Sequence, residues 1–75
     1  MKKITPAEVA SVINASPQFV RVAMQQGKLP IGTAIKMPNS EKWQYNITLH
    51  LLRQYAGEEA IERLKKLREE KNVEN

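Results

Sequence analysis

The sequence predicts a mostly α-helical fold with one β-hairpin, and three observations predict it. Two helix-start signals, each an N-cap residue followed by proline, lie close together at Thr5-Pro6 and Ser16-Pro17. After Gly27 the helical pattern gives way to two short segments in which apolar and polar residues alternate. Helix-forming residues return after Thr48. A chain of 75 residues has room for one small core, so we expect no deep substrate pocket.

The first helix is expected from about Pro6 to Asn14. Thr5 is placed to cap it, Pro6 suits the first helical position, and Glu8 completes a capping box. Its apolar stripe is formed by Val9, Val12 and Ile13.

The second helix is expected to begin at Pro17, with Ser16 as its cap, and to stop at Gly27. The inward positions predicted from helical spacing are Phe19, Val20, Ala23 and Met24. Because so few residues separate the two helices, they must turn sharply against each other. This spacing is typical of a helix-turn-helix.

The outward face of the second helix carries side chains that suit DNA bases. Glutamine pairs with adenine, arginine with guanine, and valine contacts the thymine methyl group. No carboxylate lies between Glu8 and Glu41 to repel phosphate. The alternative is an ordinary solvated face. The candidate recognition residues are Ser16, Gln18, Arg21, Val22, Gln25, Gln26 and Lys28.

Residues 33–37 and 42–47 are predicted to form the hairpin, joined by turn-forming residues. Thr33, Ile35 and Met37 share one side of the first strand, and Trp43, Tyr45 and Ile47 share one face of the second. A lone hairpin is marginally stable, so its apolar face should pack on the helices. We therefore expect Trp43 and Tyr45 to pack in the core rather than to stack on bases. The tip left free to contact a partner carries Lys36, Asn39, Ser40 and Lys42.

Two further helices are expected in the last third. Thr48 should cap one that turns Leu51, Leu52 and Tyr55 inward and ends at Gly57. The final helix should run from Glu58 to about Lys71, with frayed residues from about Asn72. Its stripe either packs on the domain or pairs weakly with a second copy. That stripe consists of Ala60, Ile61, Leu64 and Leu67. The expected organisation is a DNA-binding domain over residues 1–57 and a charged C-terminal helix over residues 58–75.

The net charge of +4 is unevenly distributed. Residues 1–55 carry a balance of +5, whereas residues 56–75 carry −1, which suits a domain that meets a polyanion with its N-terminal part. The chain has no cysteine, no aspartate and a single histidine, His50. We therefore expect no catalytic site, no metal site and no cofactor. The sequence shows no signal peptide and no membrane span, so a cytoplasmic protein is expected.

The order of elements resembles the winged helix-turn-helix of the MerR and phage excisionase superfamily. Residues 4–57 look most like small proteins of Gram-positive phages and integrative elements, with the matching motifs at Thr5–Ala10, Ser16–Arg21, Gly27–Ala34 and Trp43–Ile47. The resemblance implies that the second helix, with Gln18, Arg21, Val22 and Gln25, enters the major groove. It also implies that the wing, with Lys36 and Lys42, grips the backbone or the minor groove. The chain lacks the long dimerisation helix and effector domain of MerR regulators, and its wing is poor in arginine, so we expect neither effector sensing nor tight binding by a monomer.

The function expected is therefore sequence-specific binding of double-stranded DNA, as an excisionase that directs recombination or as a small phage regulator. It would act alone or with an integrase or other recombinase, and the C-terminal helix would support a weak homodimer or cooperative assembly. Two alternatives remain: a small terminase-like protein that marks DNA for packaging, and a protein–protein interaction module that binds no nucleic acid.

Overall fold

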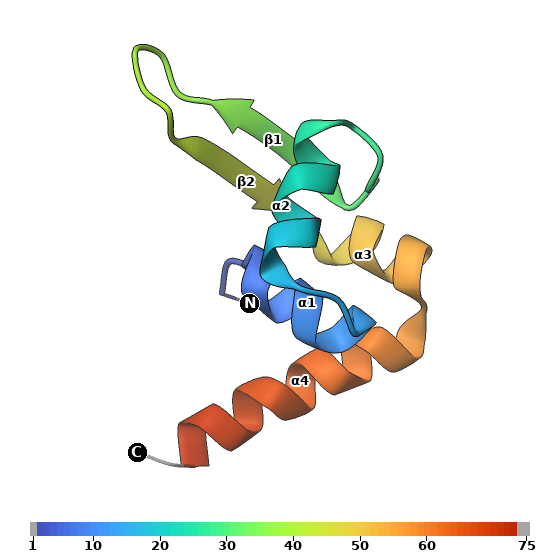
Figure 1. Ribbon diagram of the computed structural model, residues 1–75. Helices are drawn as coiled ribbons and strands as arrows, with labels where there is room; N and C mark the ends of the chain where they lie inside the picture. Colours follow the sequence, from blue (N-terminus) through green and yellow to red (C-terminus); the bar gives the residue numbers. More distant parts are fainter. Residues whose placement is uncertain (1, 74–75) are drawn as a thin grey trace.

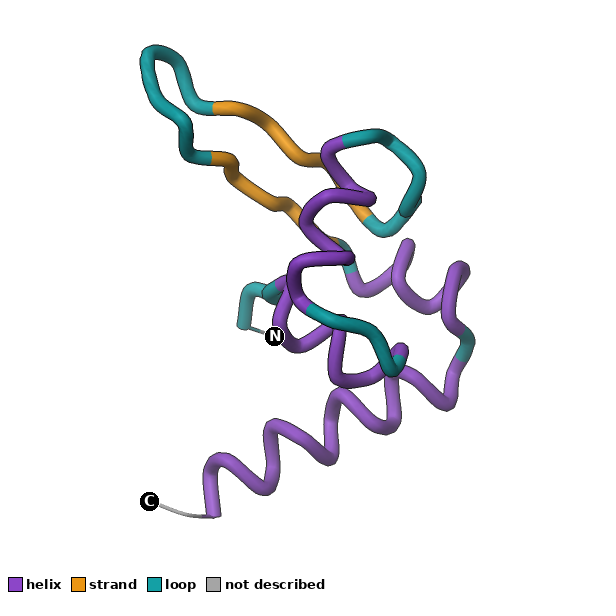
Figure 2. Tube along the Cα trace, in the orientation of Figure 1, coloured by secondary structure: helices purple, strands orange, loops and turns teal. Residues whose placement is uncertain are grey.

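The computed structural model describes residues 2–73 (Figure 1). Over this range the chain forms four helices and one antiparallel hairpin: α1 (Pro6–Ile13), α2 (Pro17–Gln25), β1 (Gly32–Lys36), β2 (Trp43–Ile47), α3 (Leu49–Ala56) and α4 (Glu58–Val73). The hairpin projects from one end of the molecule and α4 lies at the other (Figure 2). The predicted mostly helical fold with a single hairpin is confirmed at this level.

Local capping chemistry fixes the first helix as expected. The backbone N–H of Glu8 donates to Thr5 Oγ1 at 3.2 Å, and the N–H of Thr5 donates to Glu8 Oε1 at 3.0 Å. This is the reciprocal capping box. The helix ends at Ile13 because Asn14 adopts a left-handed conformation with φ of 59° and closes it.

The start of α2 is also as predicted, but one of its inward residues is not. The N–H of Phe19 donates to Ser16 Oγ at 3.1 Å, and Gly27 has a φ of +70° just beyond the helix. Val20, Ala23 and Met24 are buried, whereas Phe19 is 53 % exposed. The prediction that Phe19 faces the core is wrong, because Val20 takes the centre of the inner face and Phe19 lies about 100° around the helix from it.

The hairpin packs on the helices, but the face of β1 that points inward is the opposite of the one predicted. Antiparallel pairing sets Gly32 opposite Ile47 and Ala34 opposite Tyr45. In β2 Tyr45 and Ile47 pack on the core as predicted, but the prediction that Trp43 packs there is wrong: it is half-buried at the tip end of the ladder, opposite Lys36, and lies outside the core cluster. In β1 Ala34 packs on the core and Ile35 is 51 % exposed. The face with Thr33, Ile35 and Met37 is therefore the outer one. A side chain at Gly32 would lie 1.8 Å from the Asn46 carbonyl oxygen, so this glycine permits the close approach of the two strands.

Helix α3 supplies one fully buried residue to the core. The N–H of Leu51 donates to Thr48 Oγ1 at 3.1 Å, and Gly57 closes the helix with a φ of +88°. Leu52 is buried and Leu51 is half-buried, but Tyr55 is 49 % exposed. The prediction that Tyr55 points inward is wrong, because its side chain lines a groove against α2 instead.

Helix α4 belongs to the same core as the rest of the chain. Ala60, Ile61 and Leu64 are buried in one cluster with residues of α1, α2 and α3, and Leu67 is half-buried. The first of the two alternatives for this stripe, packing on the domain, is therefore the one observed. The core continues across residue 57, so Gly57 ends α3 without dividing the core. The helix continues to Val73, two residues past the predicted end, so the fraying predicted from about Asn72 is not observed at residues 72–73. Residues 74–75, also predicted to be frayed, lie outside the described residues.

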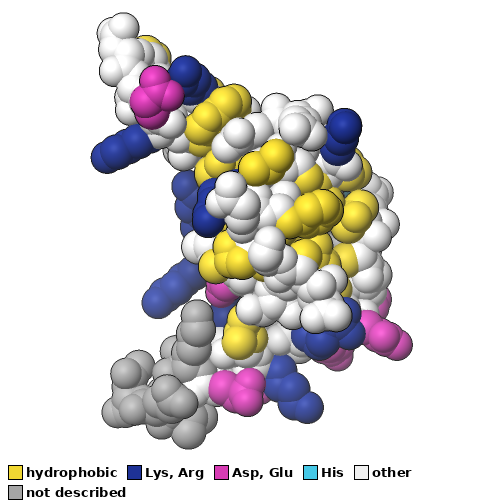
Figure 3. Space-filling view, in the orientation of Figure 1, with side chains coloured by type: hydrophobic (Ala, Val, Ile, Leu, Met, Phe, Trp, Pro, Cys, Tyr) yellow, Lys and Arg dark blue, Asp and Glu magenta, His cyan; other side chains and the backbone are white. Residues whose placement is uncertain are grey.

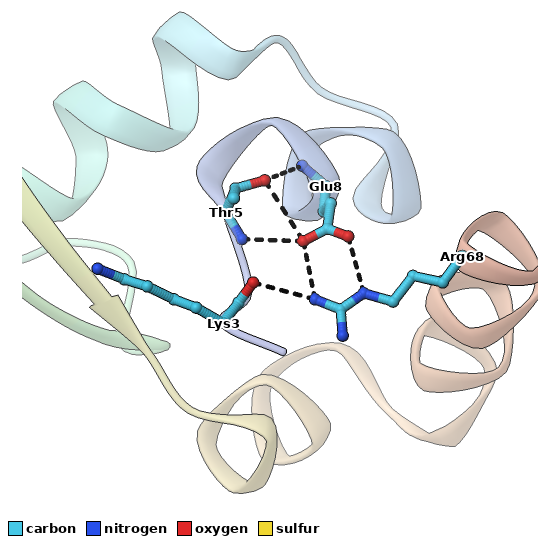
Figure 4. A network of polar contacts seen from close by, with 4 residues as sticks. All are labelled: Lys3, Thr5, Glu8 and Arg68. Carbon is cyan, nitrogen blue, oxygen red and sulfur yellow. Dashed lines mark hydrogen bonds and ion pairs between the residues drawn. The ribbon is translucent and has the colours of Figure 1, made fainter. Parts of the chain in front are cut away.

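Two arginines of α4 hold α1 at its two ends. Arg68 donates from Nε and Nη2 to the two carboxylate oxygens of Glu8, at 2.8 and 3.0 Å, and from Nη2 to the Lys3 carbonyl at 3.1 Å (Figure 4). Arg63 Nε donates to the Val12 carbonyl at 3.0 Å. The guanidinium of Arg68 is the main cause that lowers the pKa of Glu8, although burial of the carboxyl opposes this. The charged helix is thus attached to the N-terminal part by charge-assisted bonds as well as by apolar packing.

Candidate nucleic-acid interface

The outer surface of α2 has a centre and two flanks. Counting from the buried Val20 at about 100° per residue, Gln18 and Val22 lie opposite the core. Arg21 and Gln25 lie on the flank facing the hairpin, and the Nε2 of Gln25 donates to the hydroxyl of Tyr45 in β2 at 2.7 Å. Gln18, Val22 and Gln25 are all exposed. The structure therefore brings this part of the predicted recognition set onto one accessible surface.

The other flank of α2 borders an apolar groove. Phe19 and Val22 of α2 and Tyr55 of α3 are among its lining residues, with exposures of 53 %, 37 % and 49 %. Figure 3 shows hydrophobic side chains gathered over this face, with lysine and arginine at its margin. The rim is formed by Ser16, Gln18, Gln26 and Lys28. Ser16 is the N-cap of α2 and also lines this groove. Gln26 and Lys28 lie on the groove side of α2.

Arg21 does not extend from the centre of the outer surface. It is half-buried on the hairpin flank, and among the described residues it pairs with no carboxylate. Its place beside Gln25, whose amide contacts the hairpin, puts it at the junction between α2 and the hairpin.

At the hairpin tip, two of the four predicted contact residues have structural roles. Asn39 has a φ of 57°, so its side-chain type is suited to the turn. Ser40 Oγ accepts the backbone N–H of Lys42 at 3.0 Å and is half-buried. Lys36 Nζ lies 4.0 Å from a carboxylate oxygen of Glu41, the acidic residue at which the carboxylate-free stretch of the sequence ends. Lys42 is exposed, and no carboxylate pairs with it among the described residues.

Sequence reasoning missed one cationic neighbour of the hairpin. Lys3 and Lys42 both line a shallow groove whose floor includes Trp43 and Met37. The N-terminal segment reaches this position because Ile4 forms a β-bridge with Ile47. Trp43 is half-buried at this groove, and Tyr45 packs against the core as predicted. The Lys2-Lys3 pair was visible in the sequence, but nothing local predicts that it lies beside residue 42.

One exposed cation of α3 has a partner within the protein. Arg53 of α3 forms an ion pair with Glu58 at the start of α4. In residues 2–70, whose side chains the structure describes, no group of histidine, cysteine and acidic residues has the arrangement of a metal site. No described helix is both long and apolar enough to cross a bilayer.

The arrangement offers groups that can bind a partner. It presents hydrogen-bonding and cationic groups along α2 and the hairpin, and an apolar groove beside them. Comparison of the chain with known proteins finds no matching family model, no similar curated protein and no similar solved structure. The function therefore has to be argued from the surface itself.

Proposed function

We propose that this chain is a sequence-specific double-stranded DNA-binding protein of the winged helix-turn-helix type, acting as an excisionase or a small phage regulator. The observation that carries the proposal is that the outer surface of α2 and the hairpin are joined by the Gln25–Tyr45 hydrogen bond. The joined surface holds Gln18, Val22 and Gln25 as base-reading side chains and Arg21 and Lys42 as cations. Its only carboxylate among the described residues is Glu41.

The division of labour follows from side-chain chemistry. Glutamine, arginine and valine discriminate base edges in the major groove, so α2 supplies the specificity. An ammonium group is a compact charge that suits phosphate, so Lys36 and Lys42 supply affinity with little sequence information. Lys3 extends this cationic surface along the side of the hairpin. A domain that holds DNA at both α2 and the hairpin is suited to bending it, alone or beside an integrase-type recombinase.

The direct test is selection of bound sites from a random duplex pool. The affinity of the selected duplex and of a scrambled duplex is then measured over a range of salt. We expect one motif to be enriched, and log K to fall linearly with log salt at a slope of about −0.9 for each phosphate contacted. End-labelled duplexes should show energy transfer from bending on the selected site. Absence of an enriched motif refutes the proposal, and absence of salt-dependent binding as well would exclude duplex DNA as the partner.

A second candidate function is favoured by the groove between α2 and α3. Exposed Phe19, Val22 and Tyr55 form an apolar surface with Lys28 on its rim and no carboxylate among its lining residues. This arrangement fits an acidic amphipathic helix of a partner protein. If this is the function, an acidic amphipathic peptide binds in anisotropy measurements, and Phe19→Ala with Tyr55→Ala abolishes that binding. Duplex DNA then shows no salt-dependent binding.

A further inference from the structure

One side chain of the α2 surface is held in place by another element. The Nε2 of Gln25 donates to the Tyr45 hydroxyl at 2.7 Å, across a separation of 20 residues in the chain. Tyr45 is half-buried, packs against the core and lies opposite Ala34 in the hairpin, so its hydroxyl has a fixed position. Gln25 itself is exposed. Among the described residues, neither Gln18 nor Gln26 has such a bond.

The bond leaves Gln25 with a defined set of free polar groups. A primary amide has two N–H donors and one carbonyl acceptor. With one N–H donated to Tyr45, the second N–H and Oε1 remain. Adenine presents the complement of this pair in the major groove, since its N7 accepts and its N6 amino group donates.

We propose that Tyr45 is a positioning residue for Gln25, and that Gln25 held in this way reads a single adenine. This inference rests on the proposed function, because it requires α2 to lie in the major groove. A free glutamine side chain has many rotamers, and ordering it on binding weakens recognition. The bond to Tyr45 orders the Gln25 side chain before DNA binds. The hairpin then acts on sequence choice through α2, in addition to its own contacts with phosphate.

The test compares four single variants, and the double variant of Tyr45→Phe with Gln25→Ala, on the selected duplex and on duplexes changed at each position. Tyr45→Phe keeps the packed ring and removes only the hydroxyl, and Gln25→Ala removes the reader. Tyr55→Phe and Gln54→Ala are matched controls, because both residues belong to α3 and have exposed side chains. The wild type and both controls should prefer adenine at one position by roughly tenfold. Gln25→Ala should lose this preference, and Tyr45→Phe should lose most of it. The double variant should show no further loss.

A modified base separates recognition from general stability. Replacing the adenine with 7-deazaadenine removes the N7 acceptor and should weaken wild-type binding severalfold while leaving Gln25→Ala unchanged. Tyr45→Phe should bind the scrambled duplex as the wild type does and give the same far-ultraviolet circular dichroism spectrum. If a motif is selected but Tyr45→Phe keeps the full adenine preference, this inference fails and the proposed function stands. If no motif is selected, both fail.

Discussion

Arg21 is half-buried where α2 meets the hairpin, and it is the arginine best placed to reach a base from this surface. A guanidinium recognises guanine through two parallel bonds to O6 and N7, which lysine does not reproduce. Replacing Arg21 with alanine should cost about 1–3 kcal/mol on the selected site and relax the choice at one base pair. The variant Arg21→Lys should keep only part of the affinity and base preference that Arg21→Ala loses. Affinities for the selected and scrambled duplexes, measured at one salt concentration, check this prediction. Equal weakening of both would mean that Arg21 contacts phosphate only.

Glu8 and Arg68 form the most buried ion pair among the described residues, with side-chain exposures of 12 % and 19 %. Because the folded state lowers the pKa of Glu8, the pair contributes stability above the usual carboxyl pKa, and this contribution is lost as the pH falls through the acidic range below it. Arg68→Ala should cost about 1–3 kcal/mol at neutral pH. Between about pH 5 and pH 3, the free energy of unfolding of Arg68→Ala should also decrease less than that of the wild type. Urea unfolding at several pH values between neutral and pH 3 tests this prediction. Lys65→Ala is the control, because Lys65 is exposed on the same helix. An unchanged pH profile in Arg68→Ala would contradict the assignment.

At the scale of elements, the hairpin carries its cations close to one carboxylate. Lys36 lies 4.0 Å from Glu41, whereas Lys42 is unpaired among the described residues. Lys42→Ala should therefore reduce the magnitude of the salt slope by about one unit, and Lys36→Ala by less. Glu41→Gln should strengthen binding to every duplex without changing the preferred motif. Glu62→Gln is the control, because Glu62 belongs to α4, and Figure 1 shows this helix at the end of the molecule away from the hairpin tip. A changed base preference in Glu41→Gln would show that the tip reads sequence.

The elements themselves were predictable where their signals are local. The caps at Thr5, Ser16 and Thr48 and the stops at Gly27 and Gly57 depend on residues within one helical turn, and all were predicted. Alternation along β1 predicted two faces but not which one is inward. The more apolar face, with Ile35, is outward, because the register places the small residues Gly32 and Ala34 opposite the large inward residues Ile47 and Tyr45.

The interface was predictable in its residue types and not in its contacts. Gln18, Val22 and Gln25 lie on one exposed surface, as helical spacing indicates. The pairing of Gln25 with Tyr45, of Lys36 with Glu41 and of Lys3 with the groove beside Lys42 depends on how the hairpin and the N-terminal segment pack. The exposed Phe19 and Tyr55 were missed because helical spacing assigns a side of the helix but does not determine how much of that side its neighbours cover.

At the scale of the whole molecule, α4 completes the core. Ile61 and Leu64 are 1 % and 0 % exposed, and burial of such side chains contributes about 1.5–3 kcal/mol each. Because a domain of this size has a total stability of roughly 4–11 kcal/mol, a chain ending at Gly57 should not fold. A chain ending at Glu70 keeps the buried stripe and both arginines and should fold. Circular dichroism and thermal unfolding of the two truncations test this. Cooperative unfolding of the shorter chain would show that α4 is dispensable for folding.

The bond between Glu8 and Arg68 joins positions 60 residues apart, and this separation sets an order of events during synthesis. A ribosome adds about 5–20 residues per second, so α2 is made on the order of seconds before Arg68 exists. During that interval Val9, Val12 and Val20 lack the helix that covers their core. We therefore expect the surface proposed to read DNA to form only after translation has passed α4, so that the finished protein, not the nascent chain, would be the species that binds.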